Sequence, residues 1–303
     1  MLFYACVVVI FCHLLARSGA SRHLALLLTA GFAFLPNVLH WSQYYYAETA
    51  MLYYAVATTG YMFLYLREQE VKWLYVSALA GGFLTQTKVE GVFFVIPAAF
   101  ALAAGCVRNR NFQLVRRAAV YVVVVGVIFA PWWIAQRFVL GVQGGVSQIA
   151  VRDVLEQVAY LPKVATVFIS WLSTMEYMGA YVFLFPCAAL VVGLNMRQYV
   201  GRLASAYLLG ATLFSVVPYV IFFLTMPIWL IEHTFGRYFI VFTGLVYFVV
   251  ALEAIRLALT PRGDSGQMVA TACLLTWFGA VLTFWLLPDI SSRLAPKAHA
   301  EYA

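Results

Sequence analysis

The sequence predicts an all-α protein, organised as a polytopic bundle of about ten transmembrane helices. Of its 303 residues, 64% are apolar and 10% are charged, and the mean hydropathy is +0.89. Apolar runs of about 17 or more residues recur along the chain, and a helix of that length can cross the hydrocarbon core of a bilayer. The longest polar stretch is shorter than about thirty residues, so we expect residues 1–303 to form a single transmembrane domain.

The expected helices lie at approximately 1–16, 23–39, 49–66, 72–86, 90–107, 118–137, 167–193, 203–230, 235–257 and 268–287. The loops between them divide into two sets, one carrying twelve of the nineteen Lys and Arg residues and the other seven. Because cytoplasmic loops are enriched in Lys and Arg, the first set is predicted to be cytoplasmic and both termini to face outward. This distribution accounts for the net charge of +7 without nucleic acid as a partner.

The five cysteines lie in or beside apolar segments and show no CxxC spacing, so they are interpreted as packing residues. The chain also contains no phosphate loop, no metal-ligand spacing and no nucleophile elbow. We therefore expect neither ATP-driven transport nor a tightly bound metal or cofactor.

Chemically diverse side chains gather in three loops of the predicted outer face, at residues 40–49, 85–91 and 232–238. These loops contain aromatic residues, carboxylates and single cations, whereas the predicted cytoplasmic loops contain mainly arginines. A functional site is therefore expected on the outer side of the membrane.

Two cations of this face are candidates for binding a phosphate. Lys88 can act as a compact point charge, with Thr85 and Thr87 nearby; alternatively, it anchors a helix end by snorkelling to the interface. Arg237 follows Gly236 at the expected start of a helix, where the helix N-terminus would itself favour an anion.

Carboxylates and aromatic residues accompany these cations. Glu48 follows a run of tyrosines ending at Tyr46, which can stack on a sugar or simply belong to the interfacial aromatic belt. Glu90 can polarise a hydroxyl or neutralise Lys88 or Arg237. Glu232 and His233 can supply a base or a hydrogen-bond acceptor, or only cap a loop.

The longest outer loop spans residues 138–165. Its residues 151–158 place four apolar side chains on one face at helical spacing, which indicates a short amphipathic helix lying in the interface. Such a helix could cover a cavity or guide a lipid, or it could be a plain interfacial helix.

The order of these features resembles the GT-C glycosyltransferases, in particular the branch of protein O-mannosyltransferases and lipid A aminoarabinose transferases. The resemblance lies in a basic turn at 17–22, Tyr46-Ala47-Glu48, a Gly-Gly pair followed by Leu84-Thr85-Gln86-Thr87-Lys88-Val89-Glu90-Gly91, and Gly236-Arg237-Tyr238. These motifs are short, but they occur in order over nearly the whole chain.

The resemblance implies inverting transfer of a sugar from a polyprenyl-phosphate carrier to a protein, lipid or glycan acceptor on the non-cytoplasmic face. Lys88 and Arg237 match cations near the carrier phosphate, and Glu48 and Glu90 are the candidate catalytic carboxylates. Tyr46, Glu232 and His233 complete the expected substrate-binding set. The expected location is the cell membrane, as a multi-pass protein with the site facing outward.

One feature of the family has no counterpart here, because the principal catalytic acid lies in the first outer loop of such enzymes and no candidate precedes Glu48. We expect two helices and an acidic pair to precede Met1 in the active form. Two other interpretations stay open: an inactive relative, and a transporter or flippase-like lipid-handling protein without transferase activity. The absence of an evident internal repeat in the sequence argues against a transporter.

Overall fold

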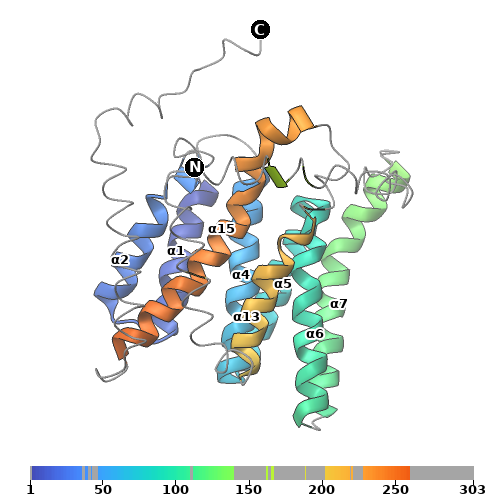
Figure 1. The fold of residues 1–303 in the computed structure, drawn as a ribbon. Coiled ribbons are helices and arrows are strands. Elements are labelled where there is room, and N and C mark those ends of the chain that lie inside the picture. Colours follow the sequence, from blue (N-terminus) through green and yellow to red (C-terminus); the bar gives the residue numbers. More distant parts are fainter. Residues whose placement is uncertain are drawn as a thin grey trace.

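The computed structural model describes residues 2–35, 38–39, 42, 47–109, 112–139, 162, 165–166, 188, 202–218, 220 and 228–259. For residues 89, 108–109, 112, 136, 228–239 and 257–259 it describes only the backbone. The described helices are α1 (Leu2–Arg17), α2 (Arg22–Ala33), α4 (Ala47–Glu68), α5 (Val71–Thr87), α6 (Val92–Asn109), α7 (Phe112–Ile134), α13 (Leu203–Phe214) and α15 (Ile228–Leu259). A 3-10 turn, η1 (Val89–Gly91), joins α5 to α6, and a π-helical turn, η2 (Ala135–Val139), extends α7. The helices lie side by side with roughly aligned axes, except that α15 crosses the others obliquely (Figure 1).

The prediction of a ten-helix polytopic bundle is wrong. The described part of the chain is helical, but it holds eight α-helices, and one of them is long and apolar enough to cross a membrane. That candidate span is Gln113–Val139, formed by α7 and η2. Four other apolar helices are shorter, namely Leu2–Arg17, Arg22–Ala33, Val92–Val107 and Leu203–Phe214. The error arose because an apolar run in a helix that packs among other helices resembles a run that faces lipid.

The helix boundaries agree with the sequence for α1, α4, α5 and α6, and depart from it elsewhere. The run 203–230 is not one helix, since α13 ends at Phe214, and α15 begins at Ile228 instead of residue 235. The helix expected at 23–39 ends at Ala33. The helices expected at 167–193 and 268–287, and nearly all of the loop 138–165, lie outside the described residues.

Helix α4 forms the centre of the core. It buries 16 of its 22 residues, so it is enclosed by neighbours on most sides and does not offer a wide face to solvent or lipid. Two glycines allow the surrounding helices to approach closely. A Cβ at Gly60 would lie 2.3 Å from a methyl group of Leu14 on α1, and a Cβ at Gly244 of α15 would lie 2.4 Å from Leu52 of α4.

The Gly-Gly pair in α5 sets its distance from α7. A Cβ at Gly82 would lie 2.7 Å from Cβ of Ile128, so α7 can pack here only because the side chain is absent. One turn later, Gln86 donates from Nε2 to the backbone carbonyl of Ile128 at 2.5 Å. Ile128 lies just before Pro131, which lacks an N–H and disrupts the backbone hydrogen bonds of the preceding turn. Gln86 therefore supplies a donor to α7 where the helix is weakened.

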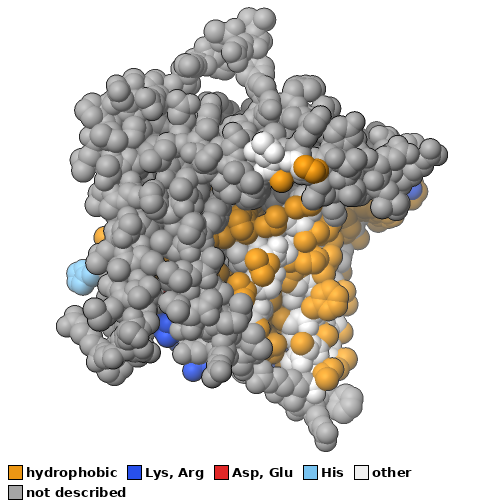
Figure 2. Space-filling view, viewed as in Figure 1, with side chains coloured by type: hydrophobic (Ala, Val, Ile, Leu, Met, Phe, Trp, Pro, Cys, Tyr) orange, Lys and Arg blue, Asp and Glu red, His pale blue; other side chains and the backbone are white. Residues whose placement is uncertain are grey.

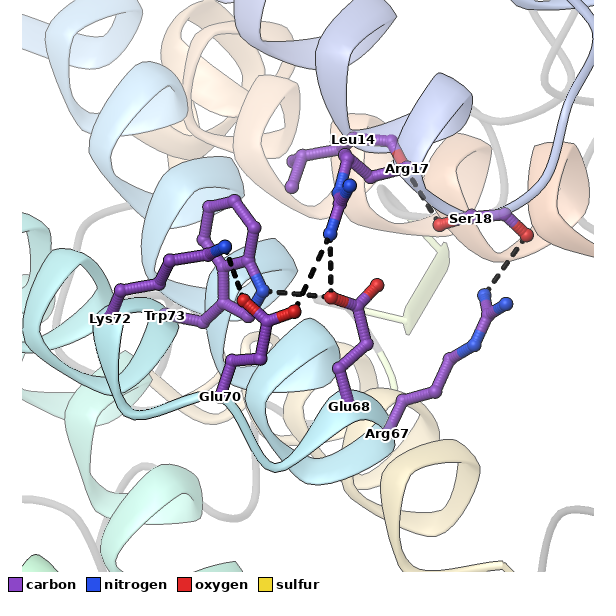
Figure 3. A network of polar contacts seen from close by, with 8 residues as sticks. All are labelled: Leu14, Arg17, Ser18, Arg67, Glu68, Glu70, Lys72 and Trp73. Atoms are coloured by element: carbon purple, nitrogen blue, oxygen red, sulfur yellow. Dashed lines mark hydrogen bonds and ion pairs between the residues drawn. The ribbon is translucent and has the colours of Figure 1, made fainter.

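At the opposite end of α5, a polar network closes the turn between α4 and α5 (Figure 3). Arg17 of α1 forms an ion pair with Glu68 at 2.8 Å, and the indole of Trp73 donates to the same carboxylate oxygen at 2.9 Å. Arg67 donates to the backbone carbonyl of Ser18 at 2.9 Å. The network ties the α1–α2 turn to the α4–α5 turn.

We expect Gly82→Val to reduce the free energy of unfolding by about 1–3 kcal/mol, because the added side chain overlaps Ile128 and forces α5 away from α7. Gly126→Ala is the matched control, since a Cβ there meets nothing within 4 Å. It should leave stability unchanged or raise it by up to about 1 kcal/mol, because alanine favours the helix. Thermal unfolding of both purified variants measures the difference, and equal behaviour would contradict the close contact of α5 and α7.

A second prediction concerns Glu68. Burial alone would raise its pKa, but the hydrogen bonds from Trp73 and Arg17 and the nearby guanidinium charges outweigh burial and lower the pKa below 4.5. The stabilisation by Glu68 is therefore complete above pH 4.5 and is lost as the pH falls through the lower folded-state pKa. Glu68→Gln should lower the unfolding temperature at pH 7 and approach the wild-type value as the pH falls through the lowered folded-state pKa. Glu70→Gln is the control: its contacts with Lys72 and, at 4.0 Å, with Arg17 are more exposed and should contribute little at any pH.

Candidate functional site

The site is organised by an ion pair between Lys88 and Glu48. Helix α5 ends at Thr87, and Lys88 adopts an extended backbone with φ −157° and ψ 154°. Its Nζ lies 2.6 Å from Oε1 of Glu48, which belongs to the first turn of α4. Two residues forty positions apart thus meet where one helix begins and another ends.

The pair is shielded from solvent to different degrees. Glu48 is 3% exposed, whereas the side chain of Lys88 retains 19% of its accessible surface. Burying a carboxylate is unfavourable unless it is paired, and a helix N-terminus adds a favourable interaction with negative charge. Glu48 is therefore held as a partner for the ammonium group, and Lys88 is the member of the pair that a ligand can reach.

The turn after Lys88 depends on Gly91. A Cβ at Gly91 would lie 2.2 Å from the carbonyl oxygen of Leu84 and 2.7 Å from its carbonyl carbon, so no other residue fits without moving the backbone. The N–H of Gly91 donates to the carbonyl of Lys88 at 2.9 Å. This close approach folds η1 back onto the end of α5 and fixes where the Lys88 side chain begins.

The neighbouring hydroxyl groups serve the helix itself. Thr85 donates to the carbonyl of Gly82 and Thr87 to that of Leu84, each at 2.7 Å. Since each hydroxyl has one proton to donate, neither is directed at an anion beside Lys88 in this arrangement. The expectation that these threonines assist phosphate binding is not supported by their geometry.

Glu90 lies in η1, half-buried, two residues from Lys88. It forms no hydrogen bond or ion pair with another described residue. Glu90 therefore does not neutralise Lys88, as the sequence had suggested it could. Glu48 takes that role instead. The signal in the sequence was the assignment of both loops to the same face, which brings their residues together without specifying the pair.

The remaining predicted residues are described less fully. Tyr46 lies outside the described residues, and for Glu232, His233 and Arg237 the structure gives the backbone alone. These three belong to the first turns of α15, at the same end of the bundle as the α5–α6 turn (Figure 1). Because α15 begins at Ile228, no helix N-terminus occurs at Gly236, and the predicted anion site of that kind is wrong.

No cluster of three or more His, Cys, Asp or Glu side chains suited to a metal ion occurs within the described ranges. The chain matches no protein-family model, no curated protein and no solved structure. Its function must therefore be inferred from the chemistry of the site.

We expect the two halves of the ion pair to be strongly coupled. Glu48→Gln leaves the ammonium of Lys88 partly buried without its carboxylate, and should destabilise the protein by somewhat less than the ~3–5 kcal/mol of a fully buried pair. In Glu48→Gln/Lys88→Met both charges are removed, so the loss should be smaller than the sum of the single losses. Chemical denaturation of the wild type, Glu48→Gln, Lys88→Met and the double variant measures the coupling, and additive losses would show that the pair contributes nothing as a pair.

Proposed function

We propose that the protein is a membrane glycosyltransferase that moves a sugar from a polyprenyl-phosphate carrier to a hydroxyl-bearing acceptor. The observation that carries the proposal is the partly accessible ammonium of Lys88, held by the buried carboxylate of Glu48 at one end of an apolar helical bundle. The order of sequence motifs that resembles such enzymes includes the same two residues.

The chemistry of transfer requires charge stabilisation and a base. The bond between the anomeric carbon and the carrier phosphate oxygen breaks, and the acceptor oxygen forms a new bond to that carbon. Negative charge develops on the departing phosphate, where a fixed ammonium such as Lys88 stabilises it. The proton of the acceptor hydroxyl passes to a carboxylate, and Glu90 is suited to this role because it is half-buried and has no ion-pair partner among the described residues.

Glu48 would act on Lys88. A carboxylate at 2.6 Å fixes the position of the ammonium group before a phosphate arrives, which reduces the reorganisation needed in the transition state. A doubly or singly charged phosphate would then share the ammonium with Glu48. This arrangement assigns Glu48 a positioning role in the proposed reaction.

A bilayer location is supported by the exposed apolar surface of α6 and α7. Phe100, Val122, Val123 and Val127 are each at least half exposed, and apolar side chains gather over the part of the molecule where α6 and α7 lie (Figure 2). Only 11% of the most apolar stretch of Gln113–Val139 is buried, so most of this helix faces outward, although Tyr121 is buried against α5. A partner for such a surface must itself be apolar.

Charges and aromatic rings mark the two ends of that helix. Arg117 near its start donates to the hydroxyl of Tyr65 at 3.0 Å, and Arg137 near its end lies 5.9 Å from the ring of Trp133. Twenty residues separate the two arginines, which corresponds to about 30 Å of helix and to the thickness of a hydrocarbon core. Trp beside Arg at one end fits an interfacial position.

A photoreactive polyprenyl phosphate tests the site directly in membranes that contain the protein. Lys88→Ala should reduce specific cross-linking about tenfold, because one charge-assisted contact to phosphate is lost. Lys72→Ala is the matched control, since Lys72 lies at the other end of α5 with 59% of its side chain exposed, and it should cross-link like the wild type. The double variant Glu48→Gln/Lys88→Met lacks Lys88 but leaves no buried charge without a partner. If it folds and still does not cross-link, the loss is one of binding and not of folding.

Unchanged cross-linking in a folded Lys88 variant would refute the phosphate assignment. Sugar transfer is tested separately, with a labelled polyprenyl-phosphate sugar and membrane acceptors. Lipid phosphate binding that depends on Lys88 without any sugar transfer would exclude the enzyme and favour a lipid-handling protein.

A further inference from the structure

A group of buried hydroxyls lies deep in the bundle, away from Lys88. It consists of Thr58 and Thr59 on α4, Ser77 on α5, Tyr121 on α7 and Tyr207 on α13, and none of them is more than 4% exposed. Among the described residues, the hydroxyl oxygens of both threonines and both tyrosines have no hydrogen-bond partner. Several unpaired polar groups at one place in a core require an explanation, because each is unfavourable when it is desolvated alone.

The five residues converge from four helices. Ser77 donates to the backbone carbonyl of Thr58 at 2.8 Å, which joins α5 to α4. One turn further along α5, the Cβ position of Gly81 lies 3.2 Å from the Tyr121 hydroxyl and 3.5 Å from a methyl carbon of Thr58. The missing side chain of Gly81 thus admits both Tyr121 and Thr58 to the same face of α5.

Tyr207 extends the group to α13. Its hydroxyl faces Thr59 without a hydrogen bond of good geometry, and Tyr121 is close enough to influence Tyr207 electrostatically. Tyr121 faces Ser77 in a similar way. The hydroxyls therefore approach one another, but they do not satisfy one another directly.

Thr58 and Thr59 also differ from several other buried hydroxyls of the bundle, although Thr29 and Thr49 are likewise without a partner among the described residues. Thr85, Thr212 and Ser215 each donate to a carbonyl of the preceding turn of their own helix. Thr58 and Thr59 make no such bond. Their hydroxyls are available to a partner that lies between the helices.

We infer that this group is a binding site for internal water, which joins α4, α5, α7 and α13 at one level of the bundle. Buried water in proteins makes two to four hydrogen bonds to polar groups that would otherwise be unsatisfied, and this site offers four such hydroxyls. The Cβ position of Gly81 lies 3.2 Å from the Tyr121 hydroxyl and 3.5 Å from a methyl carbon of Thr58, so the helices pack too closely there for a larger polar ligand. The site is independent of the proposed transferase reaction.

Isosteric removal of single hydroxyls tests the inference in the full-length protein. If the hydroxyls bind water, Tyr121→Phe and Thr59→Val should each lower the unfolding temperature by about 2 °C or more, because each leaves a bound water short of a partner. If the hydroxyls are truly unpaired, the same changes remove a desolvated polar group and should leave the temperature unchanged or raise it, which would overturn the inference.

Two matched controls separate water binding from general effects of these substitutions. Thr29→Val removes a buried, unpartnered hydroxyl of α2 outside the group, and should not lower the unfolding temperature, because a lone hydroxyl lacks the partners that hold a water. Tyr247→Phe removes a direct bond to the carbonyl of Leu28 at 2.8 Å, and should lower it additively with Tyr121→Phe.

The pair Tyr121→Phe and Tyr207→Phe should instead be less than additive, since both hydroxyls share the same water. A high-resolution experimental structure supplies the direct observation: ordered density within hydrogen-bond distance of at least two of the four hydroxyls. Direct hydroxyl-to-hydroxyl bonds throughout the group, with no density between them, would refute the water site even if single variants lose stability.

Discussion

The ion pair of Lys88 with Glu48 is the interaction on which the candidate site depends. A buried carboxylate and a partly buried ammonium are each unfavourable in an apolar bundle, and together they are tolerated at 2.6 Å. Their pairing requires that the first turn of α4 and the first residue after α5 remain adjacent. The glycine contact of Gly91 with the backbone of Leu84 then determines where Lys88 leaves the helix.

The position of α5 is itself determined by contacts along its length. At one end, Trp73 joins Glu68 and Arg17; in the middle, the Gly81–Gly82 pair admits side chains of α7; near the other end, Gln86 bonds to α7. A helix held at three levels has little freedom to shift along its axis. This rigidity suits a site that must present one ammonium group at a defined place, and it links the glycines of the core to the charge at the end of the bundle.

Much of the helical structure and part of the site could be predicted from the sequence. The limits of α1, α4, α5 and α6 followed from apolar runs ended by charged or glycine-containing turns. Lys88 and Glu48 could be chosen because charged residues are rare in such a chain and therefore informative. The extent of α15 could not be predicted, because the residues from Ile228 to Tyr238 mix apolar and polar side chains without a clear start signal.

The sequence by itself determined that the chain is helical and apolar, and that its polar residues occur at a few turns, since these properties follow from composition and local spacing. Only the tertiary structure decided that α4 lies in a core and that α7 exposes its apolar face, because periodicity does not distinguish a helix enclosed by helices from one enclosed by lipid. It also decided that Lys88 pairs with Glu48 instead of Glu90. Residues two apart at a turn point in different directions, whereas residues forty apart meet when their helices pack.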